Sequence, residues 1–328
     1  MSKPLNAASK TARDYCKKFP DAGTRTLARM LMRDHSRLYN DYEHARTHVR
    51  HHRGENGKQA RSKERAVVPT NKHERFEMPA SDSKPVEHVS LKLAGRGLIA
   101  SDWHIPYHDQ EACEIAVNHA IDSGHTDWLL INGDFLDCYQ LSNWERDPRA
   151  RRFDQELDIA RMVLERLGGI FKRKVYKEGN HEFRYERYLQ QKAPELIGVP
   201  EFRLKKLLKL KRFGFEYVEE NRVMQIEKLN VIHGHEYRFA ISNPVNPARG
   251  LFLRAKASAL CGHFHQSSQH TEGDIRRSPT SCWSLGCLCN LAPKYMPLNR
   301  WNHGFALASI EGAEYHVENC RIVNGKVV

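Results

Sequence analysis

Residues 128–137 read WLLINGDFLD, and this stretch decides the expected fold. Its first four residues are apolar and are typical of a short strand that is buried on both faces. The chain then becomes polar at once, with Gly133 and Asp134 followed three residues later by Asp137. Because ligands gather at the carboxyl ends of strands in α/β sheets, this junction predicts part of a ligand site.

The same pattern occurs four more times along the chain. Apolar runs at 98–100, 229–232 and 259–261 lead into SDWH, HGHE and GHFH, and the segment 174–177, around Val175 and Tyr176, leads into EGNHE. Amphipathic stretches at 111–122 and 154–167 predict helices between them. Strands that alternate with helices predict an α/β fold whose parallel or mixed sheet is covered on both faces.

The residues at the five strand ends offer oxygen and imidazole donors and no thiolate. They are Asp102, His104, Asp134, Asn180, His233, His263 and His265. Seven donors exceed the need of one four-coordinate ion but suit two ions that share a bridging carboxylate. We therefore expect two divalent ions, manganese first, with iron, zinc, nickel or magnesium as alternatives. Glycines beside these residues, at 133, 179, 234 and 262, allow close approach of the backbone.

Taken together, the five blocks resemble the calcineurin-like metallophosphoesterase superfamily and occur in that family's order. They are D-x-H at 102–104, GDxxD at 133–137, GNHE at 179–182, HGH at 233–235 and GHxH at 262–265. The resemblance implies a four-layer αββα sandwich that hydrolyses phosphoesters with two metal ions. It further implies one ion held by Asp102, His104 and His265, a second held by Asn180, His233 and His263, and Asp134 as the bridge.

The resemblance also implies a general acid, His181, which lies near the leaving group and is oriented by Asp137. Two ions would lower the pKa of a bridging water that acts as nucleophile, and an imidazole would protonate the departing alkoxide. Either histidine of HGH could ligate, so we assign His233 by the family pattern and give His235 a role in substrate binding. Ordinary buried polar residues at turns would explain one histidine but not the full set.

The kind of phosphoester follows from how the chain departs from branches of the family. Protein Ser/Thr phosphatases have Arg-Gly after GDxxD, whereas Cys138 and Tyr139 stand there in this chain. The two histidines of the last block are similar to the phosphodiesterase and nuclease branches. Among the arginines near the motifs, Arg184 and Arg151 are our candidates for binding substrate phosphates, with a solvated charged surface as the alternative.

Aromatic and cysteine residues near the end of the chain have less specific roles. Trp283, Tyr295 and Trp301 could stack on a base, line the mouth of the site or belong to the core, and we favour the core for Trp283. Cys282, Cys287 and Cys289 contain no C-x-x-C spacing, so we expect them to pack in a late strand.

The first quarter of the chain carries most of the net charge of +12. Residues 1–85 hold 19 Lys and Arg against 10 Asp and Glu, a net charge of +9. Apolar residues at helical spacing predict three short helices, the second capped by Thr24 and the third basic. We predict a helix-turn-helix-like module at 1–53, a linker at 54–87 and the phosphoesterase domain at 88–328.

The sequence favours two interpretations of the basic module equally. It is either a DNA-binding module or a small helical bundle with a solvated basic face. For DNA binding the candidate residues are Arg46, Arg50 and Arg53 on the third helix. The spacing of His44, His48 and His52 could suggest a metal site, but neighbouring arginines favour a basic face.

Composition narrows the class of protein. Eight scattered cysteines, no apolar stretch of about 18 residues and no signal-peptide core favour a reduced cytoplasmic protein. A helix-turn-helix joined to this domain is reminiscent of phage and mobile-element proteins. We expect a nucleic-acid phosphodiesterase, with DNA favoured. The alternatives are a phosphomonoesterase or small-nucleotide phosphodiesterase with a partner-docking module, and a non-catalytic DNA-binding regulator.

Overall fold

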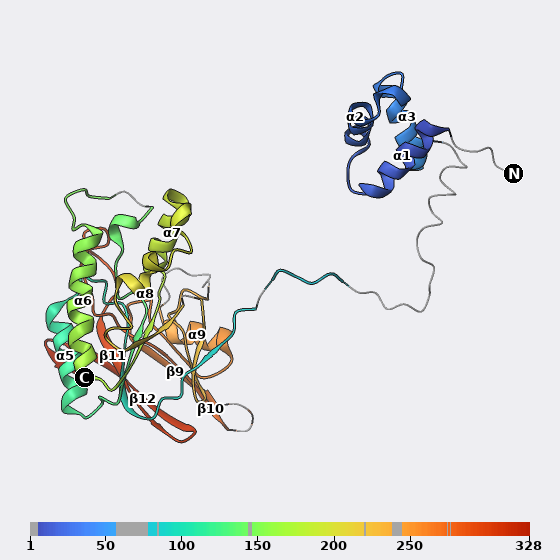
Figure 1. Ribbon diagram of the computed structural model, residues 1–328. Coiled ribbons are helices and arrows are strands. Elements are labelled where there is room, and N and C mark those ends of the chain that lie inside the picture. Colours follow the sequence, from blue (N-terminus) through green and yellow to red (C-terminus); the bar gives the residue numbers. More distant parts are fainter. Residues whose placement is uncertain are drawn as a thin grey trace. The chain divides into compact units, whose positions relative to one another are not determined.

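The computed structural model describes residues 6–56, 78–83, 85–143, 146–219, 221–237, 245–273, 275 and 277–328. These residues fall into two compact units, one within Met1–Asp82 and one within Ser83–Val328. The first unit contains the basic helices and the second contains both β-sheets (Figure 1). Much of the segment predicted as a linker at 54–87 lies outside the described residues.

The first unit packs three helices, α1 (Ala7–Lys18), α2 (Thr24–Asp34) and α3 (Tyr42–His52). The side chains of Asn6 and Asp41 cap α1 and α3 by accepting hydrogen bonds from backbone N–H groups at 2.8 and 2.7 Å. The core between the helices is formed by buried apolar side chains at helical spacing, namely Ala12, Leu27, Leu31, Ala45 and Val49.

The prediction that Thr24 caps the second helix is wrong. Gly23 occupies the cap position, and Thr24 is the first residue of α2. Its hydroxyl donates instead to Glu55 Oε1, at 2.7 Å, just beyond α3. The Thr24 hydroxyl, which local sequence rules assign to capping the helix, therefore bonds a residue distant in the sequence instead.

The second unit is built on two mixed sheets. The seven-stranded sheet has the order β13-β12-β11-β2-β3-β4-β5, and the six-stranded sheet has the order β1-β6-β7-β8-β10-β9. The strands of the first are β2 (Gly95–Ala100), β3 (Trp128–Asn132), β4 (Arg173–Lys177), β5 (Phe215–Val218), β11 (His303–Glu311), β12 (Glu314–Val323) and β13 (Lys326–Val327). Those of the second are β1 (Val89–Ser90), β6 (Met224–Ile226), β7 (Leu229–Val231), β8 (Ala259–Cys261), β9 (Ser268–Gly273) and β10 (Pro279–Ser284).

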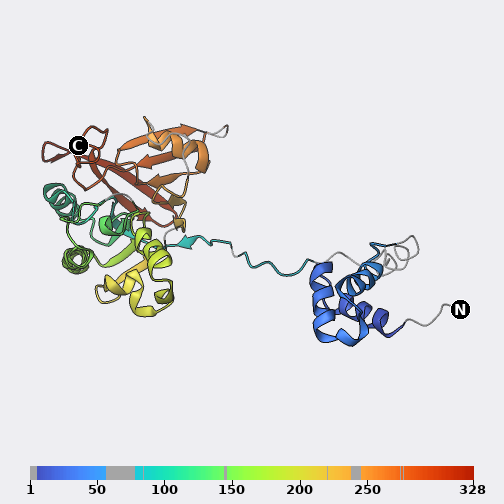
Figure 2. The same cartoon turned by 90° about the horizontal axis from the view of Figure 1, so that it is seen from above.

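Neighbouring residues of the central strands face different cores. Leu98 of β2 packs toward the helices α5 (Gln110–Asp122) and α6 (Phe153–Ile170), whereas Ile99 packs against the other sheet. The outer face of the six-stranded sheet is covered by α9 (Pro247–Ala255). The layers are therefore helix, sheet, sheet and helix (Figures 1 and 2), which confirms the predicted sandwich.

The strands that precede the five motifs are β2, β3, β4, β7 and β8. The first three are parallel neighbours, and β7 and β8 are parallel neighbours in the other sheet. Parallel strands end at the same edge of a sheet, so the residues that follow them are brought together. The connection after β4 continues into α7 (Phe183–Lys192) and α8 (Leu204–Leu207). Among the described helices, none has the length and apolar character of a membrane span.

Candidate metal centre

The backbone at the strand ends has an unusual conformation. Five of the seven predicted ligands have positive φ angles: 57° at Asp102, 48° at His104, 50° at Asp134, 70° at His263 and 55° at His265. This left-handed region is uncommon for non-glycine residues, although Asp and His adopt it more often than most. Five such residues therefore lie in the loops that carry the candidate ligands.

Glycines let the ligand loops lie against one another. A Cβ atom at Gly179 would collide with Asp134, and one at Gly133, where φ is 85°, would collide with the ring of His233. The sequence predicts that these glycines let the backbone approach the ions. In the structure they also let neighbouring ligand loops approach one another.

One group of donors forms around two histidines. The Nε2 atoms of His104 and His265 lie 3.2 Å apart. Asp102 Oδ1 is 3.2 Å from His265 Nε2 and 3.9 Å from His104 Nε2, and Asp134 Oδ2 is also 3.9 Å from His104 Nε2. The structure thus brings together the four side chains that we predicted for the first ion.

A second group lies on the other side of Asp134. His233 Nε2 is 3.2 Å from Asp134 Oδ2, and the ring of His263 lies 5.2 Å from that of His233. Ligand atoms of Asp134, His233 and His263 all lie within 4.8 Å of one another. Asp134 therefore stands between the two groups, in the position that a bridging carboxylate would occupy.

Each carboxylate uses one oxygen to hold the backbone and presents the other to the centre. Asp102 Oδ2 accepts the N–H of His263 at 2.9 Å, and Asp134 Oδ1 accepts the N–H of His181 at 2.9 Å. Within the described part of the chain, the buried Asn180 Oδ1 makes no hydrogen bond, whereas Asp102 Oδ1 and His233 Nε2 lie 3.2 Å from His265 and Asp134 in ion pairs. A buried polar atom without a partner is costly, and a bound cation would satisfy Asn180 Oδ1. These residues therefore fit a divalent metal site.

The charges of the histidines depend on the two carboxylates. Burial opposes protonation of His233 and His265, yet Asp134 and Asp102 raise the pKa of His233 to about 10 and that of His265 to about 9. Burial lowers the pKa of His263 to about 3. Without metal, protons on two histidines thus neutralise the carboxylates, and a cation would compete with these protons.

His181 is held between Asp137 and Arg184. Its Nδ1 lies 3.0 Å from the carbonyl oxygen and 3.1 Å from Oδ1 of Asp137, so Nδ1–H donates to them. Arg184 donates to His181 Nε2 at 2.8 Å and to the Asp137 carbonyl at 3.0 Å. Burial alone would raise the pKa of Asp137, but hydrogen bonds from His104 and His181 hold it well below its usual range. The predicted acid, its orienting carboxylate and a candidate phosphate ligand form one cluster.

The other predicted substrate residues lie differently. His235 Nδ1 is 3.6 Å from Glu236 Oε2, and the ring of His235 is 5.4 Å from that of His233. Arg151 is an exposed residue just before α6. Neither belongs to a described group of candidate metal ligands.

The candidate DNA-binding arginines all have partners within the helical unit. Arg46 pairs with Glu43 at 3.0 Å, and Arg50 pairs with Glu55 at 3.3 Å. The guanidinium of Arg53 donates to the backbone carbonyls of Phe19, Pro20 and Ala22. Arg53 therefore has a structural role between helices that the sequence analysis did not predict.

Two buried carboxyl groups accept hydrogen bonds from the backbone of the loops that carry the candidate ligands. Glu182 accepts the N–H groups of Asp134, Phe135, Leu136 and Gly179 and the hydroxyl of Tyr176, at 2.8–3.1 Å. Glu156 of α6 accepts the N–H of Cys138 at 2.7 Å, where φ is 51°. The GNHE motif could have drawn attention to Glu182, whereas no local signal marks Glu156.

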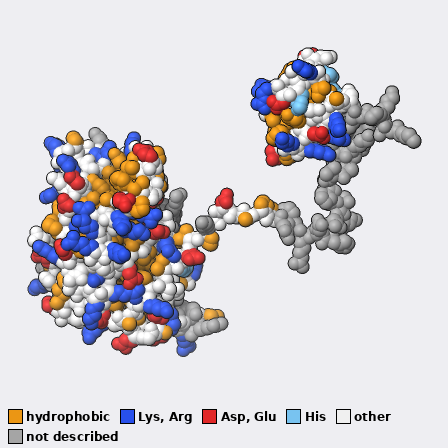
Figure 3. All heavy atoms as spheres, in the orientation of Figure 1, with side chains coloured by type: hydrophobic (Ala, Val, Ile, Leu, Met, Phe, Trp, Pro, Cys, Tyr) orange, Lys and Arg blue, Asp and Glu red, His pale blue; other side chains and the backbone are white. Residues whose placement is uncertain are grey.

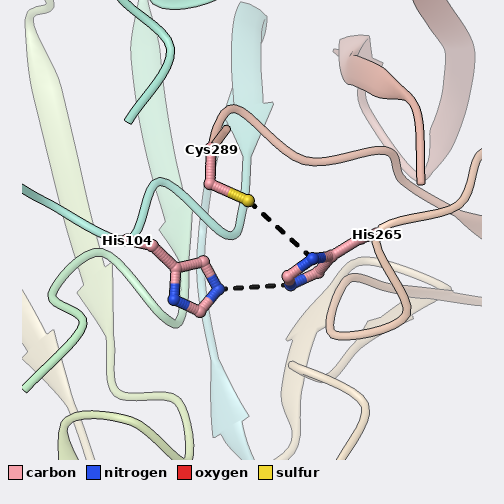
Figure 4. Close-up of side chains that lie close together, drawn as sticks. All are labelled: His104, His265 and Cys289. Carbon is pink, nitrogen blue, oxygen red and sulfur yellow. Dashed lines mark hydrogen bonds between the residues drawn. The ribbon is translucent and has the colours of Figure 1, made fainter. Parts of the chain in front are cut away.

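Cys289 is a neighbour of the centre that the sequence analysis missed. Its Sγ lies 3.8 Å from His265 Nδ1, on the side of the ring opposite His104 (Figure 4). Cys282, Cys287 and Cys289 are buried, as expected for packing residues, but Cys289 also belongs to a group with His104 and His265. Trp283 lies in the core between the sheets, as predicted.

A separate cavity of about 1020 Å³ lies beside α7. Its described lining includes Glu182, Tyr185, Phe202 and Tyr217 but none of the candidate metal ligands. Figure 3 shows hydrophobic side chains exposed beside α7, with Lys and Arg side chains spread over the same face. The cavity therefore adjoins the ligand loops through Glu182, and the candidate ligand side chains are not part of its described lining.

An αββα sandwich with histidine, carboxylate and amide donors at its strand ends defines a metal-dependent phosphoesterase domain. Residues 96–255 match the family described as calcineurin-like phosphoesterase, which is the family that the five motifs resemble. The GHFH block at 262–265 lies beyond the matched range, yet the fold returns His265 to the same cluster.

The chain is also similar to individual proteins. It is 27% identical over 248 residues to the Gene 54 protein of Mycobacterium phage L5, which covers 71% of this chain and 96% of that protein. Among solved structures, Vps29 of Entamoeba histolytica complexed with zinc has 13% identity and a TM-score of 0.37, covering 71% of this chain and 96% of that one. Vacuolar Protein Sorting 29 of Cryptosporidium parvum has 14% identity and a TM-score of 0.39, covering 71% and 94%.

Proposed function

We propose that the chain is a two-metal phosphodiesterase that acts on nucleic acid. The observation that carries this proposal is the position of Asp134, whose Oδ2 lies 3.2 Å from His233 Nε2 and 3.9 Å from His104 Nε2. When bound, two divalent ions polarise a phosphoryl group and lower the pKa of a water molecule. Manganese is our first choice, with iron, zinc, nickel and magnesium as alternatives. One ion would be held by Asp102, His104 and His265, the other by Asn180, His233 and His263.

His181 is our candidate for the general acid. Asp137 accepts from its Nδ1, which leaves Nε2 as the atom that exchanges a proton with a leaving group. In the substrate-free arrangement Arg184 donates to this same Nε2. A substrate phosphate would draw the Arg184 guanidinium away, so that His181 can carry the proton there. Arg184 would then replace the arginine that protein Ser/Thr phosphatases have after GDxxD.

The choice of nucleic acid has three supports. The first 85 residues have a net charge of +9, which favours a polyanionic partner. Arg184 and the exposed Arg151 offer cations for flanking phosphates. The likeness to a mycobacteriophage protein supports our expectation of a phage-encoded enzyme that acts on DNA in a bacterial cytoplasm.

One observation favours a second candidate function. Because Arg46, Arg50 and Arg53 have partners inside the helical unit, fewer cations are left for DNA phosphates. A phosphomonoesterase or small-nucleotide phosphodiesterase whose helical unit docks a partner would account for this. The complete set of metal donors argues against a non-catalytic regulator.

Hydrolysis assays separate these functions. Metal-free protein resupplied with manganese would be tested on bis-p-nitrophenyl phosphate, p-nitrophenyl phosphate and end-labelled single- and double-stranded DNA. The proposal expects cleavage of the diester and of DNA, and loss of both in Asp134→Ala. Activity confined to the monoester would reject it in favour of a phosphatase.

A further inference from the structure

The loop at 290–301 exposes apolar side chains next to the metal centre. It follows the core strand β10 and has no helix or strand of its own. Tyr295 is 70% exposed, Met296 42% and Leu298 93%. Exposed apolar groups clustered in one loop beside a polar site indicate a binding surface rather than a packing element.

The base of this loop is tied to the loops that carry candidate ligands. Just before it, the N–H of Leu288 donates to the carbonyl of Asp102 at 3.0 Å. Just after it, the N–H of Asn302 donates to the carbonyl of His265 at 2.9 Å. The position of the loop is therefore set by the same backbone that positions the metal donors.

One side chain holds the interior of the loop in shape. The Asn299 amide donates to the carbonyls of Leu291, at 2.7 Å, and Met296, at 2.9 Å. Asn299 Oδ1 accepts the N–H of Trp301 at 2.8 Å. These bonds satisfy backbone groups that a loop without regular structure would leave to water. The exposed side chains are thus presented from an ordered platform.

Aromatic rings lead from the centre to the loop surface. Trp301 packs against the ring of His265, with centroids 4.2 Å apart at 63°. Tyr295 follows at 6.4 Å from Trp301, also at 63°. An exposed tyrosine lies two rings away from a candidate metal ligand, which is the distance scale of one nucleotide unit next to the reacting phosphate.

The charge of the loop selects the kind of partner. Residues 290–301 contain Lys294 and Arg300 and no acidic residue, and both cations are exposed. Aromatic rings beside cations are the features by which proteins bind single-stranded nucleic acid, because every base offers a face for stacking and every linkage a charge. A purely apolar partner would leave both cations without a role.

We propose that the 290–301 loop binds the nucleotide unit esterified at the scissile phosphate of a nucleic-acid strand. Tyr295 stacks on its base, and Lys294 and Arg300 contact the neighbouring phosphates. The inference rests on the proposed phosphodiesterase function and adds the residue that recognises the base.

The test uses the full chain loaded with manganese and two diesters that differ only in the base. They are thymidine 5′-p-nitrophenyl phosphate and its analogue with 1,2-dideoxyribose in place of thymidine. Loss of one stacked base should lower kcat/KM of the wild type about tenfold. In Tyr295→Ala, the ratio of kcat/KM for the thymidine diester to kcat/KM for its base-free analogue should be close to one. Tyr295→Phe should retain the wild-type ratio. Tyr188→Ala, at an exposed tyrosine of α7, is the matched control and should leave both rates unchanged.

The outcomes separate the inference from the proposed function. If Tyr295→Ala leaves the ratio of the two kcat/KM values at the wild-type level, base stacking at Tyr295 is rejected while phosphodiester hydrolysis stands. If the wild type hydrolyses neither diester, the proposed function fails. In that case the inference is tested by binding alone. The concentration of thymidine 5′-phosphate that quenches tryptophan emission should be about tenfold higher for Tyr295→Ala than for the wild type. Equal affinities of the two proteins would overturn the inference.

Discussion

The Nε2 atoms of His104 and His265 lie 3.2 Å apart although 161 residues separate them in the chain. Both rings are almost fully buried, and Asp102 Oδ1 lies within 4 Å of each Nε2. Two imidazole nitrogens and a carboxylate oxygen that converge in this way form a cation site in which no single residue is sufficient. Asp134 lies near histidines of both this group and the second one, so its removal should affect both ions at once.

Asp134→Ala should reduce the metal content from about two ions per chain to less than one, because Asp134 Oδ2 lies near the histidines of both groups. Elemental analysis after dialysis against manganese measures this content. Asp158→Ala, an exposed carboxylate of α6, is the control and should keep full occupancy. Full occupancy in Asp134→Ala would contradict the bridging role.

His181→Ala should keep both ions but lower the turnover of bis-p-nitrophenyl phosphate by about 10²- to 10⁴-fold, as expected for loss of a general acid. The ring touches Asp137 and Arg184, and its Nε2 is 3.8 Å from Asp134, so metal retention is an informative check. Turnover at the wild-type level would remove His181 from this role.

Glu156→Gln should stabilise the protein at alkaline pH. Burial raises the pKa of Glu156 from 4.5 to about 8, so between these values the folded state holds a proton that the unfolded state releases. The contribution of Glu156 to stability is therefore present at low pH and is lost as the pH rises through about 8. Glutamine keeps an acceptor for the N–H of Cys138 and cannot ionise.

Urea unfolding at several pH values measures this effect. The free energy of unfolding of Glu156→Gln, relative to wild type, should rise from about pH 5 and level off above about pH 8. Glu165→Gln, on the exposed side of α6, serves as control and should run parallel to the wild type. A constant difference between Glu156→Gln and wild type would show that Glu156 does not titrate in this range.

Replacing both Arg46 and Arg50 by Gln should weaken DNA binding if α3 contacts phosphates. Loss of two phosphate contacts would reduce the slope of log K against log salt by about 2 for double-stranded DNA. Fluorescence anisotropy over a series of salt concentrations gives this slope. The double variant Lys228→Gln and Lys326→Gln, in the phosphoesterase unit, is the control. An unchanged slope for the α3 variant would assign the helical unit to a partner other than DNA.

Much of the fold follows from local sequence because its signals are local. Strand ends such as that before Asp134 show an abrupt change from apolar to polar residues, and the helices α5 and α6 are visible as periodic stretches. The positions of the seven candidate ligands were found in this way, since each follows a strand directly. Their roles as ligands remain predictions for the metal and activity measurements.

Contacts between distant segments were not predictable from the same signals. Cys289 near His265, Glu156 beneath Cys138 and Arg184 at His181 Nε2 depend on how separate loops and helices pack. Thr24 shows the same limit, since a local capping rule failed where a contact with Glu55 was available. Side-chain hydrogen bonds of this kind depend on distances that no spacing in the sequence encodes.

The sequence by itself determined the alternation of strands and helices and the chemical type of each donor. This is because hydrophobic periodicity and side-chain chemistry are properties of single segments. The resemblance implied which donors share an ion and that Asp134 bridges them, whereas only the tertiary structure decided the distances between these donors and placed Cys289 beside His265. Those relationships arise when two sheets pack and bring the ends of five strands to one place, where burial and close contact select the partners of each charged atom.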